Sequence, residues 1–170
     1  MNKVLIIGCP GSGKSTFARA LHEVTNLPLV YLDMLFWNAD RTSVSREVFD
    51  ERLEKAMQGE RWIIDGNYSR TMERRFAACD TIIFLDYPTE VCIESVRARR
   101  GKARPDMPWI EREDDPDYGE FLDFVRNFKI DRRPQIMALL EKYADKTIVM
   151  LTSRQQAEEY LKTEEKSYVL

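Results

Sequence analysis

The chain has 170 residues and a net charge of −3, with 44% apolar and 32% charged residues. This length suits one domain, 1–170, that buries a core without disulfides or structural metals. The acidic balance argues against a chain-wide attraction to nucleic acid, although local basic clusters can still bind phosphate. The three cysteines form no CxxC pair. We therefore expect reduced thiols, not zinc ligands or a disulfide frame.

Membrane and export signals are missing from the pattern. No apolar run approaches the roughly 20 residues that cross a bilayer. The first residues lead through one lysine and a short strand into a glycine-rich loop, unlike a signal peptide. We therefore expect a cytoplasmic protein with no membrane partner, either a monomer or a homodimer.

Short apolar runs alternate with amphipathic helical stretches along the chain. The runs are nearly continuous, which is typical of strands covered on both faces of a parallel sheet. This alternation predicts a three-layer α/β fold. The charged and proline-rich stretch 102–116 fits neither element, and such a stretch is usually a functional lid or a disordered excursion. The predicted strands are 4–7, 29–32, 62–64, 81–85 and 147–151.

A phosphate-binding loop is the strongest motif. Residues 8–15 read GCPGSGKS and match GxxxxGK[ST], between an apolar strand and a helix-forming run. Glycines let backbone N–H groups turn toward phosphate oxygens, and the helix that follows points its positive end at them. Lys14 is expected to reach the β- and γ-phosphates, and the Ser15 hydroxyl to ligate magnesium. The motif predicts ATP and Mg²⁺ as cofactors, with nucleotide contacts from Gly8, Pro10, Gly11, Ser12, Gly13, Lys14, Ser15 and Thr16.

Three aspartates follow predicted strands, at the edge where parallel sheets bind ligands. Asp65 precedes Gly66, which permits close backbone approach to a phosphate, so we favour Asp65 as the acid of the magnesium shell. Asp86 precedes Tyr87-Pro88 and is expected to cap the next helix. Asp33 has two open interpretations: a general base for a hydroxyl acceptor, or structural support.

These motifs together resemble the adenylate-kinase-like P-loop kinases, and most closely the small bacterial group labelled "DNA topology modulation protein" (FlaR-like). The resemblance covers about residues 3–162 and implies a five-stranded parallel sheet in the order 2-3-1-4-5. It also implies a short lid, approximately 101–133, that closes over the phosphates. The segments that carry it are GCPGSGKST at 8–16, LDMLFW at 32–37, WIIDGNYSR at 62–70 and FLDYP with ARR at 84–100.

The acceptor side departs from the family pattern. In nucleoside monophosphate kinases an arginine follows the DML segment, and here Phe36 and Trp37 stand there. Residues 67–69 replace the usual Phe-Pro, which puts Arg70 one position further from the glycine. An aromatic side chain in place of a phosphate clamp favours a less charged acceptor, or a nucleoside held by stacking. The acceptor-side candidates are Asp33, Trp37, Gly66 and Arg70.

Several arginines are candidates for the transferred phosphoryl group. A guanidinium presents a planar fork to phosphate oxygens, and the resemblance implies such roles for Arg99, Arg126 and Arg132. For each of them taken alone, a surface cation near a helix end is the favoured explanation, and the case for phosphate contact rests on the group. Arg154 occupies the place where relatives close over adenine, so it either stacks on the base or belongs to a plain helix cap.

The combined pattern predicts a kinase that moves the γ-phosphoryl group of ATP to a small acceptor, such as a nucleoside, a nucleotide or a related molecule. Two alternatives stay open. One is an ATP-binding regulatory protein that affects DNA topology, as the family label suggests. The other is a P-loop ATPase switch without an acceptor. Direct DNA binding is not expected, because the chain is acidic and carries no DNA-binding motif.

Overall fold

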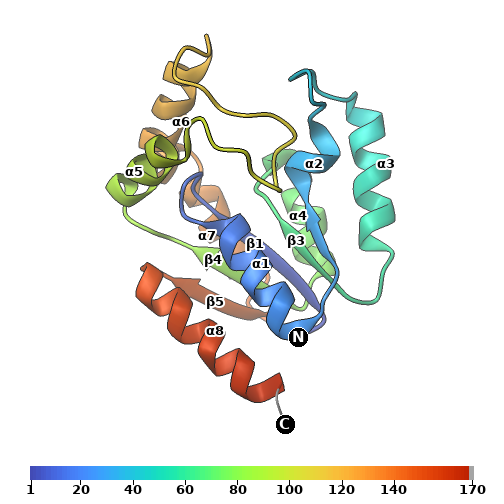
Figure 1. The fold of residues 1–170 in the computed structure, drawn as a ribbon. Coiled ribbons are helices and arrows are strands. Elements are labelled where there is room, and N and C mark those ends of the chain that lie inside the picture. The colour runs from blue at the N-terminus through green and yellow to red at the C-terminus, as the bar shows by residue number, and fades with distance from the viewer. Residues whose placement is uncertain (169–170) are drawn as a thin grey trace.

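A five-stranded parallel sheet forms the centre of the computed structural model, which describes residues 1–168 (Figure 1). The strand order is β2-β3-β1-β4-β5, which confirms the predicted α/β class and the order implied by the resemblance. The strands are β1 (Lys3–Gly8), β2 (Leu29–Tyr31), β3 (Trp62–Asp65), β4 (Thr81–Leu85) and β5 (Thr147–Leu151).

The three central strands are buried along almost their whole length. Every residue of β3 and β4 is buried, as is β1 after Lys3. Their mostly apolar sequences follow from this burial, because helices cover both faces of the sheet. The parallel register places Ile6 of β1 beside Asp65 of β3, and Gly8 beside Leu85 of β4. The ends of these strands therefore lie next to one another at one edge of the sheet.

Helices cover the sheet on both faces and complete the three layers. In Figure 1, α1 and α8 lie side by side in front of the sheet, and α4 and α7 lie behind it. No helix within residues 1–168 is both long and apolar enough to cross a membrane. The helices are α1 (Lys14–Thr25), α2 (Leu32–Phe36), α3 (Arg46–Met57), α4 (Ser69–Ala78), α5 (Thr89–Arg99), α6 (Tyr118–Asp131), α7 (Arg133–Lys142) and α8 (Arg154–Tyr168).

The segment between α5 and α6 crosses the carboxyl edge of the sheet toward α2 (Figure 1). Two residues of the connection from α2 to α3, Trp37 and Arg41, contact this segment. Arg41 donates to Asp115 at 2.5 Å and to the carbonyl of Ile110 at 3.0 Å, and Trp109 packs edge-on against Trp37. The proline-rich stretch is therefore an ordered crossing, and α6 also lies within the predicted lid range.

Gly66 allows the loop after β3 to lie directly against the start of α2. Its φ is +138°, and a β-carbon there would lie 2.9 Å from the Leu32 β-carbon. Both features select glycine, since other residues are strained at this φ and have no room for a side chain. From the sequence, Gly66 is expected to allow a close approach of the backbone to a phosphate. In the structure, its close approach is to Leu32.

We expect Gly66→Ala to destabilise the fold by about 2–4 kcal/mol, through backbone strain and overpacking against Leu32. Gly119→Ala is the matched control. Gly119 lies in α6 with no atom near its would-be β-carbon, so alanine there should be neutral or stabilise by up to about 1 kcal/mol. Urea unfolding of both variants measures the difference. Equal stabilities would contradict the packing argument.

Candidate nucleotide and acceptor site

The phosphate-binding loop joins β1 to α1 in the conformation that its glycines permit. Gly11 and Gly13 both have φ of +87°, and a β-carbon on Gly13 would meet nothing within 4 Å. Gly8 is needed for a different reason, because its β-carbon would lie 2.5 Å from the carbonyl oxygen of Leu85. Lys14 crosses the loop and donates to the Cys9 carbonyl at 3.1 Å. The loop thus keeps open space at the start of α1, where the helix favours an anion.

A buried carboxylate faces this loop from β3. Ser15 Oγ donates to Asp65 Oδ2 at 2.5 Å, and Asp65 Oδ1 has no partner within the described residues. Burial raises the Asp65 pKa to about 6, against the opposing effects of Lys14 and the Ser15 hydrogen bond. The protonated carboxyl therefore favours folding at low pH, and this contribution is lost as the pH rises through about 6. A bound cation would relieve that cost.

This pair fits magnesium by its chemistry. A hydroxyl and a carboxylate with a free oxygen are ligands that Mg²⁺ accepts, usually alongside substrate phosphates and water. Residues 1–168 hold no cluster of three or more His, Cys, Asp or Glu that could hold a metal alone. Ser15 and Asp65 would therefore hold the ion together with a nucleotide.

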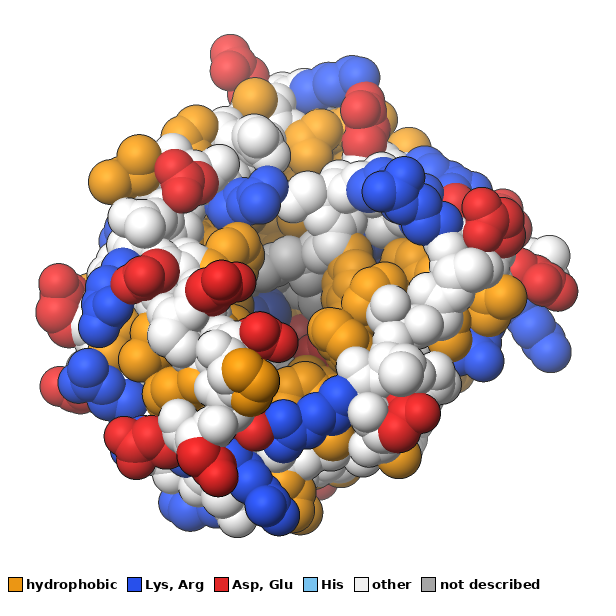
Figure 2. All heavy atoms as spheres, turned by 90° about the horizontal axis from the view of Figure 1, so that it is seen from above, with side chains coloured by type: hydrophobic (Ala, Val, Ile, Leu, Met, Phe, Trp, Pro, Cys, Tyr) orange, Lys and Arg blue, Asp and Glu red, His pale blue; other side chains and the backbone are white. Residues whose placement is uncertain are grey.

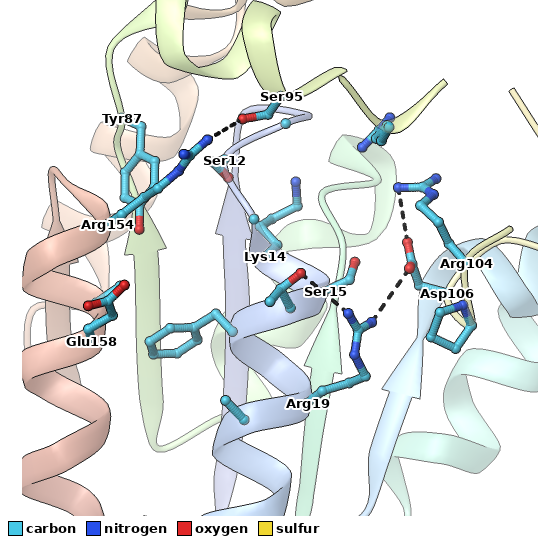
Figure 3. Close-up of a pocket in the computed structure, with 18 of the residues that line it drawn as sticks. Ser12, Lys14, Ser15, Arg19, Tyr87, Ser95, Arg104, Asp106, Arg154 and Glu158 are labelled. Carbon is cyan, nitrogen blue, oxygen red and sulfur yellow. Dashed lines mark hydrogen bonds and ion pairs between the residues drawn. The ribbon is translucent and has the colours of Figure 1, made fainter. Parts of the chain in front are cut away.

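A cavity of about 510 Å³ opens beside the phosphate-binding loop, a size that suits a nucleotide. Seen from above, the molecule is hollowed at its centre, with apolar and charged side chains around the opening (Figure 2). Figure 3 shows Arg154, Tyr87 and Glu158 at one end of the cavity and Arg104 with Asp106 at the other. Arg154 lines the cavity and donates to Ser95 Oγ at 2.6 Å, and its contact with the base stays a prediction.

A chain of ion pairs links the crossing segment to the cavity. It runs from Arg19 of α1 to Asp106, then to Arg104, Glu111 and finally Arg99 at the end of α5, with distances of 3.7, 3.3, 3.6 and 2.7 Å. Asp106 and Glu111 are buried. Arg99 and Arg104 both line the cavity and are paired with acids rather than free in solvent. The sequence did not identify Arg104 as a site residue, because it is one of several basic residues in a charged stretch.

The other two arginine candidates lie elsewhere. Arg126 is exposed on α6 and pairs with Asp123 at 2.6 Å. Arg132, at the junction of α6 and α7, lies over the Phe124 ring and lines a second, smaller cavity with Asn67. The structure therefore groups Arg99 with the phosphate-binding loop, but neither Arg126 nor Arg132 lines that cavity.

The acceptor side is built around Asp33 and aromatic rings. Asp33 lies in the first turn of α2 and accepts a hydrogen bond from Tyr68 Oη at 2.7 Å. Burial raises the Asp33 pKa, while the Tyr68 hydrogen bond and the Lys14 charge lower it. The Phe36 ring lies 4.9 Å from Trp37 and 5.2 Å from Tyr68, centroid to centroid. A carboxylate and an aromatic surface thus occur together beside the phosphate-binding loop.

Asn67 is a second residue that the sequence argument missed. Its side chain accepts from the Gly8 N–H at 3.1 Å and donates to the Gly8 carbonyl at 2.8 Å. This reciprocal pair joins the loop after β3 to the first residue of the phosphate-binding loop. The only sequence signal was the departure from the family pattern at 67–69.

Two further side chains bind partners away from the cavity. Arg70 makes a two-point contact with Asp50 of α3, at 2.9 and 2.5 Å, on the exposed side of α4. The expectation that Asp86 caps α5 is wrong, because Pro88 occupies the cap and Asp86 accepts from Arg133 at 3.0 and 3.1 Å. The two hydrogen bonds from the Arg133 guanidinium hold the Asp86 carboxylate, so it does not cap α5.

Comparison with solved structures places this architecture among known folds. A shikimate kinase from Bacteroides thetaiotaomicron aligns with a TM-score of 0.58 at 19% identity, covering 98% of each chain. A shikimate kinase from Acinetobacter baumannii in complex with shikimate gives 0.60 at 16% identity, over 96% of this chain and 90% of that one. A gluconokinase from Sinorhizobium meliloti gives 0.57 at 15% identity, over 99% and 91%.

The chain has the P-loop kinase fold. No protein-family model matches it, and no curated protein matches it by sequence. At identities below 20% the likeness concerns the fold, and the chemistry has to be argued from the site itself.

Asp65→Asn should weaken the magnesium-dependent part of nucleotide binding by about 10–100-fold, because a neutral amide is a poor ligand for Mg²⁺. Titration of a fluorescent ADP analogue with and without Mg²⁺ measures it. In the wild type the magnesium effect should decline as the pH falls through about 6, where Asp65 takes up a proton.

Asp86→Asn is the matched control for Asp65→Asn. It should change the magnesium effect less than about twofold and lower stability instead, because Arg133 loses its partner. A larger magnesium defect in Asp86→Asn than in Asp65→Asn would overturn the choice of Asp65 as the acid of the magnesium shell.

Proposed function

We propose that this protein is a magnesium-dependent kinase that transfers the γ-phosphoryl group of ATP to a hydroxyl of a small acceptor. The observation that carries the proposal is that Lys14, Arg99 and Arg104 line one cavity, while Asp33 lies near enough for the charges of Lys14 and Arg104 to lower its pKa. A binding module needs only the phosphate-binding loop. Phosphoryl transfer also needs cations over the moving group and a group that receives the acceptor proton.

The chain's own residues divide the work between binding and stabilisation. The loop amides and Lys14 would bind the phosphates, and Ser15 with Asp65 would hold the magnesium, which neutralises developing charge when bound. Arg99 and Arg104 would exchange Glu111 and Asp106 for phosphate oxygens as the segment 101–133 closes as a lid. Closure excludes water, which favours transfer over hydrolysis.

Asp33 would act as the general base. The acceptor oxygen attacks the γ-phosphorus, the bond from that phosphorus to the bridging oxygen breaks, and the hydroxyl proton passes to Asp33. Burial raises the Asp33 pKa toward the range useful for proton transfer. Tyr68 would orient the carboxylate, and Trp37 would contact the acceptor's apolar face. The aromatic rings of Phe36, Trp37 and Tyr68 favour nucleosides and small alcohols as acceptors. Some contacts stay predictions: those of Gly66, Arg70, Arg126 and Arg132 with phosphate, and that of Arg154 with the base.

The motif resemblance also leads us to propose kinship with the adenylate-kinase-like kinases, closest to the FlaR-like group. A role in DNA topology through direct DNA contact gains no support from the arginines beside the cavity, since Arg99 and Arg104 are paired with carboxylates.

The deciding experiment screens nucleosides, nucleoside monophosphates and small alcohols for acceptor-dependent ADP release. Release that no acceptor stimulates would favour the ATPase switch, and salt-sensitive retardation of supercoiled DNA would favour the regulator.

Lys14→Ala should lower phosphoryl transfer by at least about 100-fold, because it removes a positive charge from the developing transition state. The fold should be unaffected, since Lys14 is partly exposed and its side chain hydrogen-bonds, within residues 1–168, to the Cys9 carbonyl. Steady-state rates and thermal melting of the purified variant test this. A folded variant with near-normal turnover would rule out the assigned role.

Asp33→Asn should lower turnover with a hydroxyl acceptor by roughly 100-fold or more, the usual scale for a positioned base. Affinity for ATP should change less than about twofold, because the side-chain hydrogen bond that Asp33 makes within residues 1–168 is with Tyr68. With a nucleoside monophosphate acceptor, whose oxygens are already ionised, the loss should be smaller. Unchanged turnover with a hydroxyl acceptor leaves Asp33 a structural role.

A further inference from the structure

Arg75, on α4, is fully buried and has no acidic partner within the described residues. Its guanidinium donates instead to three consecutive backbone carbonyls, of Gly66 at 2.7 Å, of Asn67, and of Tyr68 at 3.0 Å. Burial lowers the Arg75 pKa to about 9. A cation buried without a counter-charge is costly, and these carbonyls provide the compensation.

The three residues that Arg75 contacts hold both halves of the site. Asp65, just before them, accepts from Ser15. The Asn67 side chain makes the reciprocal pair with Gly8 of the phosphate-binding loop. Tyr68 has a left-handed backbone with φ of +40° and donates to Asp33. A non-glycine residue in that conformation persists only where its surroundings hold it.

We propose that Arg75 is a positioning residue that sets the phosphate-binding loop and the acceptor carboxylate through one backbone segment. By holding the carbonyls of residues 66–68, it orients Asn67 toward Gly8 and Tyr68 toward Asp33. The inference rests on the proposed function, since it concerns the same site. Arg75 lines neither cavity. The proposal predicts that a change at Arg75 nevertheless alters the phosphate-binding loop and the environment of Asp33 together.

The geometry needs a guanidinium. Its five N–H donors lie in one plane and reach several acceptors at once, whereas a lysine ammonium offers three donors at a single point. Arg75→Lys therefore keeps the charge and loses the fork. Arg74→Lys is the matched control, because Arg74 is exposed on the same helix and its ion pairs within the described residues are with the surface acids Asp50 and Glu54.

Nucleotide affinity gives the first readout. We expect Arg75→Lys to weaken binding of mant-ADP with Mg²⁺ about tenfold, the scale of losing one oriented hydrogen bond, and Arg74→Lys to change it less than twofold. In an Asn67→Ala background, Arg75→Lys should add less than twofold, because the two act through one contact. Normal affinity in Arg75→Lys, or a full tenfold addition to Asn67→Ala, overturns the proposal.

Two measurements without nucleotide separate positioning from general stability. Amide exchange at Gly8 should accelerate in Arg75→Lys toward its rate in Asn67→Ala, while Leu5 in the middle of β1 stays protected. The carboxyl ¹³C signal of Asp33 at constant pH should shift as it does in Tyr68→Phe. Uniformly faster exchange at both amides, with an unmoved Asp33 signal, would show a merely structural role and sink the idea.

If Arg75→Lys does not fold, Arg75→Gln carries the same test, since it keeps an amide donor and removes the buried charge. The wild type also separates the two claims. Failure of wild-type protein to bind mant-ADP would sink the proposed function, while the Gly8 and Asp33 signals would still decide the role of Arg75.

Discussion

The hydrogen bond between Ser15 and Asp65 is the contact on which the rest of the site depends. It joins the first turn of α1 to the end of β3, the strand that pairs with β1, at 2.5 Å. Because Asp65 is buried and one of its oxygens has no hydrogen-bond partner among residues 1–168, the charged carboxylate is costly without a cation. Keeping a carboxylate in that state makes sense where a charged ligand completes it. The fold is thus built around a position that a nucleotide–metal complex would satisfy.

Ion pairs with carboxylates hold Arg99 and Arg104 at the cavity. Arg99 and Arg104 line the cavity yet hold Glu111 and Asp106, so they avoid the cost of isolated buried charge. Exchange of a carboxylate for a phosphate conserves the number of charge-assisted hydrogen bonds. The aromatic contact between Trp37 and Trp109 ties the same segment to the acceptor side. In the proposed function, nucleotide binding and acceptor enclosure would therefore involve one stretch of chain.

The sequence predicted the parts of the fold that arise from local pattern. Each of the five apolar runs became a strand, because burial on both faces demands continuous apolar residues. The pairing of Ser15 with an acid at the end of β3 also followed, since parallel strands bring their carboxyl ends to one edge. The prediction that Asp86 caps a helix was wrong because it used only local sequence. The actual partner of Asp86, Arg133, lies 47 positions further along the chain.

The sequence by itself determined the phosphate-binding loop, the sheet and the candidate acids, because motif spacing and strand periodicity are encoded within short windows. Only the tertiary structure decided which side chains meet. Asn67 read as a departure from a family pattern and turned out to hold Gly8, and Arg75 carried no signal at all. Both side chains bind backbone groups, which every residue possesses. The sequence therefore contains no particular residue type that would identify their partners. Such contacts become visible only when the chain has folded.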